Sequence, residues 1–192
     1  MTDKDIPGVV IIEDFLPEFD RVREHAKLSH FYDWQANDGQ IYKRISMLHV
    51  PNMLTSLEEN VGLIKIGLMG YRLNYENEEP NQSIHADLGF MTHACVVFLN
   101  DGDSGTAFWQ HKETGATEIW YGQAELFEQI KDDFENPDAW EQRLYVPAKK
   151  NRAVIYKGNM FHSRYPFKAF GSTPDDGRLI AIAFFAFPES EE

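Results

Sequence analysis

The feature that most constrains the fold of this chain is a series of short β-branched and aromatic runs in its second half. These runs lie at 92–99, 106–110, 117–120, 152–156, 161–164 and 178–187. Turn-forming clusters rich in Gly, Asn and Asp separate them, notably at 100–105, 157–159 and 171–177. Many short strands between glycine turns are typical of a β-sandwich or an open barrel. We therefore expect a mainly β fold.

The last of these runs is apolar at successive positions, as expected of a central strand that is covered on both faces. Arg178 stands at its start. Because a charge at the mouth of an apolar strand is costly without a partner, Arg178 needs an ion pair or a functional role.

Helical patterns flank the β-rich region. A strand at 9–12 is followed by a helix at 18–28, a short helix at 52–60 and one or two strands at 62–75. Between the later strands, 123–142 has apolar residues at helical spacing, namely Leu126, Phe127, Ile130, Phe134 and Trp140. With no linker in its 192 residues, the chain is expected to form a single domain with a helical insertion around 123–142.

The charge and cysteine content narrow the classes of function. A net charge of -13 repels phosphate backbones, which argues against direct nucleic-acid binding. No apolar stretch approaches the roughly 20 residues of a membrane span, and the charged N-terminus lacks an apolar signal core. The one cysteine, Cys95, lies in an apolar run and is expected to be buried and unreactive. We expect a cytoplasmic protein, and the sequence carries no signal for an oligomeric state.

A candidate metal site begins at His85-Ala86-Asp87. The three-residue motif alone is weak, since roughly half a match is expected by chance in this composition. A second histidine, His162, follows 75 residues later at the end of a predicted strand. Two histidines and one carboxylate can occupy one face of an octahedral Fe(II) and leave three positions open.

The segments around this motif resemble the 2-oxoglutarate/Fe(II)-dependent dioxygenase superfamily, and most closely its prolyl-hydroxylase-like branch, which includes small uncharacterised bacterial and phage oxygenases. The resemblance is carried by 85–87, 97–100, 104–109, 159–163 and 177–178, and by the N-terminal segment 10–17. It covers nearly the whole chain in order. It implies a double-stranded β-helix (a jelly-roll, cupin-like core) with the metal at its mouth.

The resemblance also implies roles for individual residues. His85, Asp87 and His162 match the three iron ligands of the family, and Arg178 matches the basic residue that pairs with the distal carboxylate of 2-oxoglutarate. A guanidinium suits that role because it binds a carboxylate bidentately and stays charged. The alternatives for this site are Arg164 or Lys168 as the carboxylate-binding residue, and for Arg178 a structural ion pair with Asp175 or Asp176.

Three further residues are candidates for the co-substrate pocket. In the prolyl-hydroxylase pattern a tyrosine upstream of the metal motif hydrogen-bonds the co-substrate. Tyr71 and Tyr75 precede His85 by 14 and 10 residues, and neither spacing matches well. A core tyrosine is the alternative for both. Thr106 is the third candidate.

A competing motif is His111-Lys112-Glu113, which also pairs a histidine with a carboxylate. It has no second histidine at a matching position, so a surface turn is expected there.

The function implied is an Fe(II)- and 2-oxoglutarate-dependent oxygenase that uses dioxygen to hydroxylate a C–H bond, with succinate and CO2 as co-products. The carboxylate of Asp87 favours hydroxylation, because the halogenating relatives replace it by a small residue. A cupin-like isomerase or lyase and a non-catalytic 2-oxoglutarate-binding module remain as alternatives. The substrate, a small molecule or a peptide or protein, does not follow from the fold.

Overall fold

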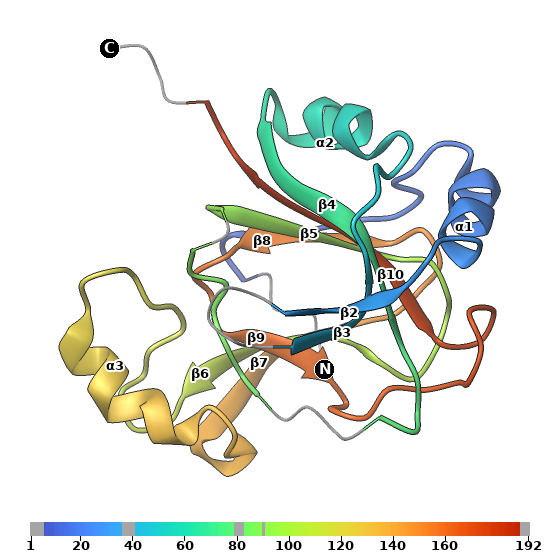
Figure 1. Cartoon of the computed structure of the whole chain (residues 1–192). Coiled ribbons are helices and arrows are strands. Elements are labelled where there is room, and N and C mark those ends of the chain that lie inside the picture. Colours follow the sequence, from blue (N-terminus) through green and yellow to red (C-terminus); the bar gives the residue numbers. More distant parts are fainter. Residues whose placement is uncertain (1–5, 36–40, 79–82, 90, 189–192) are drawn as a thin grey trace.

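The protein folds into two antiparallel β-sheets that face each other, with helices on the outside (Figure 1). This computed structural model describes residues 6–35, 41–78, 83–89 and 91–188. The larger sheet has the strand order β1-β8-β5-β10-β4-β3-β2, and the smaller sheet has the order β7-β6-β9. The mainly β fold with flanking helices that the sequence predicts is therefore confirmed.

The strands are β1 (Val9–Ile12), β2 (Tyr32–Gln35), β3 (Ile41–Ser46), β4 (Lys65–Asn74), β5 (His93–Phe98), β6 (Gly105–His111), β7 (Trp140–Pro147), β8 (Ala153–Lys157), β9 (His162–Tyr165) and β10 (Arg178–Ala186). The helices are α1 (Phe19–Lys27), α2 (Met53–Val61), α3 (Ala124–Ile130) and the short 3-10 helices η1 (Lys131–Asp133) and η2 (Pro137–Ala139).

Strand β10 is the middle strand of the larger sheet, paired with β5 on one side and β4 on the other. Successive side chains of a strand point to opposite faces, so an interior strand that is covered twice is apolar throughout. On β10, Leu179 and Ala181 pack into the outer core, and Ile180 packs between the two sheets. The double-sided coverage predicted for this strand is confirmed.

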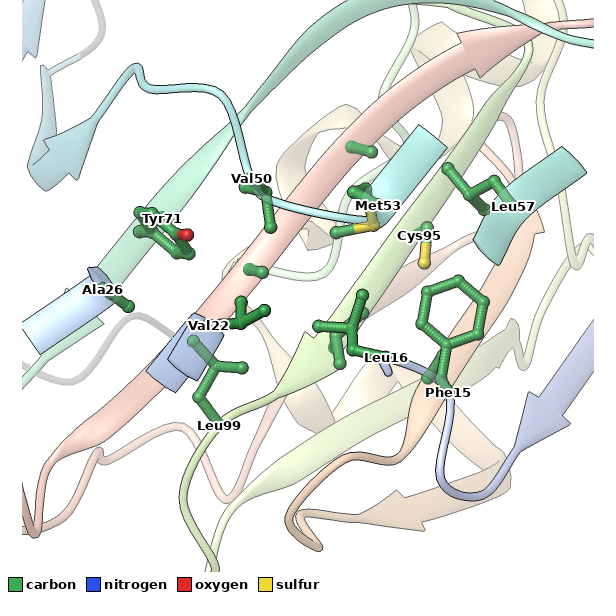
Figure 2. Close-up of a cluster of buried hydrophobic side chains, with 14 of the residues drawn as sticks. Phe15, Leu16, Val22, Ala26, Val50, Met53, Leu57, Tyr71, Cys95 and Leu99 are labelled. Atoms are coloured by element: carbon green, nitrogen blue, oxygen red, sulfur yellow. The ribbon is translucent and has the colours of Figure 1, made fainter. Parts of the chain in front are cut away.

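The outer core lies between the larger sheet and helices α1 and α2 (Figure 2). Helix α1 contributes Val22 and Ala26, and α2 contributes Met53 and Leu57, all fully buried. Cys95 of β5 belongs to the same cluster, which confirms that this thiol is buried. These helices fix the back of the larger sheet and leave its other face to the interior.

Two further clusters complete the interior. The first lies between the sheets and includes Phe98, Phe108 and Tyr156. The second packs the outer face of β6, through Trp109, against the segment of α3, η1 and η2, through Ile130. The smaller sheet is thus covered on both faces as well.

The sequence-based element boundaries are wrong in three places. Residues 117–120 form no strand; Glu118 makes only an isolated bridge to Met160. Strands β2 and β3, at the edge of the larger sheet, and strand β7 were not predicted. Trp140 begins β7 rather than belonging to a helix, because the polar residues of β7 face solvent while Trp140, Leu144 and Val146 face inward. Edge strands with an exposed polar face give only a weak apolar alternation.

None of the helices in the described part of the chain has the length and apolar character that a membrane span requires.

Candidate metal centre and cavity

The two candidate histidines are held opposite each other by their own backbones. His85 and His162 form an isolated antiparallel bridge, in which the amide of His85 donates to the carbonyl of His162 (3.0 Å) and the amide of His162 donates to the carbonyl of His85 (2.8 Å). Their ring centroids lie 4.6 Å apart. The segment that precedes β5 is in this way fixed against the start of β9.

Backbone carbonyls set the orientation of both rings. Nδ1 of His162 lies 2.9 Å from the carbonyl oxygen of Met160, and Nδ1 of His85 lies 3.2 Å from that of Ser83. Because a carbonyl can only accept, each Nδ1 carries a proton, and each Nε2 is the nitrogen left to bind a metal. This is the usual arrangement of metal-binding histidines, whose second nitrogen donates to a carbonyl or a carboxylate.

Asp87 completes the cluster. Its two carboxylate oxygens lie 3.2 Å from Nε2 of His162 and 3.7 Å from Nε2 of His85. The three candidate ligand atoms lie within 4.8 Å of one another. The backbone amide of Asp87 donates to the carbonyl of Gly158 (2.6 Å), so the turn between β8 and β9 holds it in place.

The charges within this cluster favour the ligating forms of His85 and Asp87, and they favour on His162 a proton that a metal ion could replace. Burial and the nearby charge of His162 lower the pKa of His85 to about 4, so that its imidazole is neutral near neutral pH. Burial alone would raise the pKa of Asp87, but the two histidines, His162 foremost, hold it below its ordinary value. Burial likewise opposes protonation of His162, whereas the carboxylate of Asp87 outweighs it and raises the pKa of His162. A metal cation that replaced the proton of His162 would be stabilised by the same carboxylate of Asp87.

A cavity extends from this cluster between the two sheets. Its apolar and aromatic lining comes from Trp34, Tyr42, Ile45, Met47, Leu68, Val96, Tyr156, Ile180, Ile182 and Phe184. Its polar lining, besides the cluster itself, comes from Arg72, Asn74, Ser83, Thr106, Ser163, Arg164 and Arg178. Arg178 is thus brought to the same cavity as the His-Asp-His cluster, as the sequence predicts.

Arg178 has few partners of its own. It is 6% exposed, its Nε is buried without a hydrogen-bond partner among the described residues, and its Nη1 makes one long bond of 3.5 Å to the side chain of Asn74. Burial and the charges of Arg164 and Arg72 lower its pKa to about 9. A buried guanidinium with unsatisfied donors is suited to an anionic ligand.

The alternative for Arg178, an ion pair with Asp175 or Asp176, is not found among the described residues. The carboxylate of Asp175 lies 2.6 Å from Nζ of Lys27, and that of Asp176 accepts bonds from the backbone and side chain of Thr173. Of the two rivals for the carboxylate-binding role, Lys168 is exposed and does not line the cavity, whereas Arg164 does. Arg164 therefore stays a rival for that role, and Lys168 does not.

Comparison with models of known protein families gives one match. Residues 79–185 match the model of a family of unknown function, DUF6445. The chain belongs to this family. The matched segment contains the His-Asp-His cluster and Arg178, whereas Arg72 and the strands β2, β3 and β4 precede it. A search of curated proteins found no match for this DUF6445 protein.

Solved structures share its fold. SnoK, described as a non-heme alpha-ketoglutarate-dependent carbocyclase from nogalamycin biosynthesis, has a TM-score of 0.53 and 11% identity, with 93% of this chain and 79% of SnoK covered. An N-substituted L-amino acid dioxygenase from Burkholderia ambifaria has a TM-score of 0.52 and 12% identity. The match covers 93% of this chain and 82% of the dioxygenase. EvdMO1 has a TM-score of 0.55 and 14% identity over 94% of this chain, which spans 47% of EvdMO1. The DUF6445 protein therefore has the jelly-roll fold of 2-oxoglutarate-dependent oxygenases.

Of the other three residues predicted for the co-substrate pocket, one lines the cavity and two do not. Thr106 lies on β6 with its side chain in the cavity. Tyr71 does not reach it: this residue of β4 is fully buried in the outer core (Figure 2), and its hydroxyl lies 2.8 Å from Nδ1 of His25 on α1. Tyr75 packs against the same core and against the guanidinium of Arg44. Neither tyrosine lines the cavity, and both pack in or against the outer core, as the alternative of a core tyrosine requires.

Two of the cavity residues that were not predicted from the sequence carry polar groups close to the cluster or to Arg178. Tyr156 of β8 is buried with its ring 4.7 Å from that of His162, and Arg72 of β4 lines the cavity beside Asn74. A signal for Arg72 was present, since it is a charge inside a largely apolar strand, as is Arg178.

His111, the competing motif, lies apart from the cavity. It is 1% exposed, its Nε2 lies 3.1 Å from the carboxylate of Asp133, and Thr114 contacts its Nδ1. The predicted surface turn is wrong for His111 itself, which is a buried residue that links β6 to η1.

Proposed function

We propose that this protein is an Fe(II)- and 2-oxoglutarate-dependent oxygenase that hydroxylates a C–H bond, with succinate and CO2 as co-products, and that it belongs to the prolyl-hydroxylase-like branch. One observation carries the proposal. Two Nε2 atoms and one carboxylate converge in a cavity that also contains Arg178, a buried guanidinium with unsatisfied donors.

The donor set fits the metal. Neutral imidazoles and a carboxylate suit Fe(II), whereas thiolate-binding metals would need cysteines, and the only cysteine of the chain is buried in the outer core. Both rings are already oriented through their Nδ1 protons. Fe(II) bound there would supply the redox chemistry that couples dioxygen, 2-oxoglutarate and substrate.

The protein's own residues bind and orient the reactants. Arg178 would hold the distal carboxylate of 2-oxoglutarate, with Thr106 as a further hydrogen-bonding group on the facing sheet. Val96, Ile180 and Ile182 form an apolar wall that keeps water away from the reacting centre. The carboxylate of Asp87 occupies the position that a halide would need, which supports hydroxylation.

The deciding experiment measures succinate released from 2-oxoglutarate by the protein with added Fe(II) in air, with and without candidate substrates. We expect succinate to form, and to be lost in Asp87→Ala. His93→Ala is the matched control, since His93 stacks on Phe185 at the edge of β5 and does not line the cavity.

Iron binding without any succinate would overturn the enzymatic proposal. The protein would then be a non-catalytic 2-oxoglutarate-binding module if 2-oxoglutarate binds, or a cupin-like isomerase or lyase if it does not.

A further inference from the structure

The cavity contains more positive charge than iron and 2-oxoglutarate require. Arg72, Arg164 and Arg178 all line it. Among the described residues, the acidic groups that act on them are Glu78, which influences all three guanidiniums, and Asp87 of the metal cluster, which influences Arg72. Glu78 is already engaged by the guanidinium of Arg44, the side-chain amide of Asn74 (3.0 Å) and the backbone amide of Tyr75 (2.8 Å).

The three guanidiniums differ in the hydrogen-bond partners that they have. Arg164 donates through Nε (3.0 Å) and Nη2 to the carbonyl of Phe167. Arg178 would be satisfied by 2-oxoglutarate. For Arg72 the described residues offer no hydrogen-bond partner to Nε, which is buried, and its guanidinium only lies over the ring of Tyr42, 5.8 Å from the centroid. A buried cation in this state is costly unless a ligand completes it.

Charge balance leaves Arg72 and Arg164 without a counter-charge, and hydrogen bonding distinguishes them. Fe(II), the carboxylate of Asp87 and the two carboxylates of 2-oxoglutarate would together carry one negative charge, which Arg178 balances. Arg164 is held by a carbonyl near the end of β9. Arg72 is left as the cation that faces the remaining space.

Strand register separates Arg72 from Arg178. Arg178 pairs with Asn74 across β10 and β4, whereas Arg72 pairs with Ile180, two residues further along. Two residues of a strand span roughly 6.6 Å, so the two guanidiniums can hold two different carboxylates.

The surroundings of Arg72 are aromatic and apolar. Tyr42 and Trp34, on strands β3 and β2, lie with ring centroids 5.6 Å apart, and Ile45 pairs with Arg72 from β3. All of these residues line the cavity. A ligand that reaches Arg72 would therefore meet one cation and a largely apolar wall.

We propose that the substrate is a small organic acid, whose carboxylate is bound by Arg72 while its carbon skeleton packs against Trp34 and Tyr42. This inference rests on the proposed function, because it assigns Arg178 and the metal cluster to 2-oxoglutarate and iron. Arg72 is the specificity-determining residue, since it places the C–H bonds of the bound acid toward the His-Asp-His cluster.

The test uses the protein loaded with Mn(II) in place of Fe(II) and saturated with 2-oxoglutarate, so that no turnover occurs. Binding of matched acid–amide pairs, such as hexanoate with hexanamide and 3-phenylpropanoate with 3-phenylpropanamide, is measured by calorimetry. Relaxation of the ligand protons by Mn(II) reports their distance from the metal. We expect at least one acid to bind about tenfold or more tightly than its amide, as a charge-assisted pair predicts.

Substitutions test whether the preference for the acid over its amide depends on Arg72. Arg72→Gln should abolish it and leave 2-oxoglutarate affinity within about twofold, which also shows that the cavity is folded. Arg178→Gln should lose 2-oxoglutarate affinity, and Arg143→Gln, an exposed arginine on β7, should change neither. If Arg72→Gln does not fold, Arg72→Lys should keep part of the preference, because lysine retains the charge without the planar fork.

Two results would overturn the inference. One is a wild-type protein that binds 2-oxoglutarate but prefers no acid over its amide. The other is an Arg72→Gln variant that loses 2-oxoglutarate affinity as strongly as Arg178→Gln. Absence of 2-oxoglutarate binding to the wild-type Mn(II) protein would instead contradict the proposed function itself.

Discussion

Arg178 and the metal cluster should respond separately to substitution, because they would hold different ligands. Arg178→Ala is expected to weaken 2-oxoglutarate binding at least about 30-fold, since truncating one partner of a buried charge pair costs roughly 2–5 kcal/mol. Mn(II) affinity, measured by chelator competition without 2-oxoglutarate, should stay within about twofold. Lys168→Ala, an exposed cation outside the cavity, is the control. Intact 2-oxoglutarate affinity in Arg178→Ala would show that another residue holds the distal carboxylate.

Cys95 should be inert in the folded protein. It is 1% exposed, and burial raises its pKa well above the ordinary value, so little thiolate forms even in mildly alkaline buffer. We expect no iodoacetamide adduct by mass spectrometry under native conditions and one adduct in denaturant. Rapid labelling of the native protein would mean that the outer core around α2 opens readily.

At the scale of elements, Asn151 ties the start of β8 to the loop between β1 and α1. Its side chain accepts a bond from the amide of Leu16 (2.8 Å) and donates to the carbonyl of the same residue (3.0 Å). Its backbone has a φ of 62°, in the left-handed region. Both features suit asparagine, which tolerates this conformation better than most residues.

Asn151→Ala should therefore lower the free energy of unfolding by about 2–4 kcal/mol, from two buried hydrogen bonds and the left-handed backbone. Asn151→Gly, which relieves the backbone but not the lost bonds, should cost about 1–2 kcal/mol less than alanine. Urea denaturation measures both. Equal costs for the two variants would show that the backbone conformation contributes nothing.

At the scale of the whole molecule, metal binding should stabilise the fold, because the ligands come from segments far apart in the sequence. Unfolding separates His85 and Asp87 from His162, so the metal binds only the folded state. Mn(II) at about 100 times its dissociation constant contributes about 2.7 kcal/mol, which corresponds to a rise in Tm of roughly 5–10 °C for a chain of this size. Differential scanning fluorimetry with and without EDTA measures it. A shift of the same size in Asp87→Ala would place the metal elsewhere.

The sequence predicts some elements better than others for physical reasons. Strand β10 was identifiable because burial on both faces leaves an uninterrupted apolar run. The edge strands β2 and β3 carry solvent-facing polar residues, and that pattern resembles a loop. The face of β4 that meets the cavity was not predicted, since a shift of one residue exchanges Tyr71 for Arg72, and a charge within an apolar run does not by itself distinguish a cavity from solvent.

The sequence by itself determined the mainly β class, the buried thiol and the candidate ligands, because apolar alternation, turn residues and ligand chemistry are local properties. Only the tertiary structure decided which side chains share a cavity. It brought His162 against His85 through reciprocal backbone bonds, turned Tyr71 into the outer core and placed Arg72 in the same cavity as the metal cluster. These outcomes depend on strand pairing and on which face each sheet turns inward, and both are settled by packing over the whole molecule.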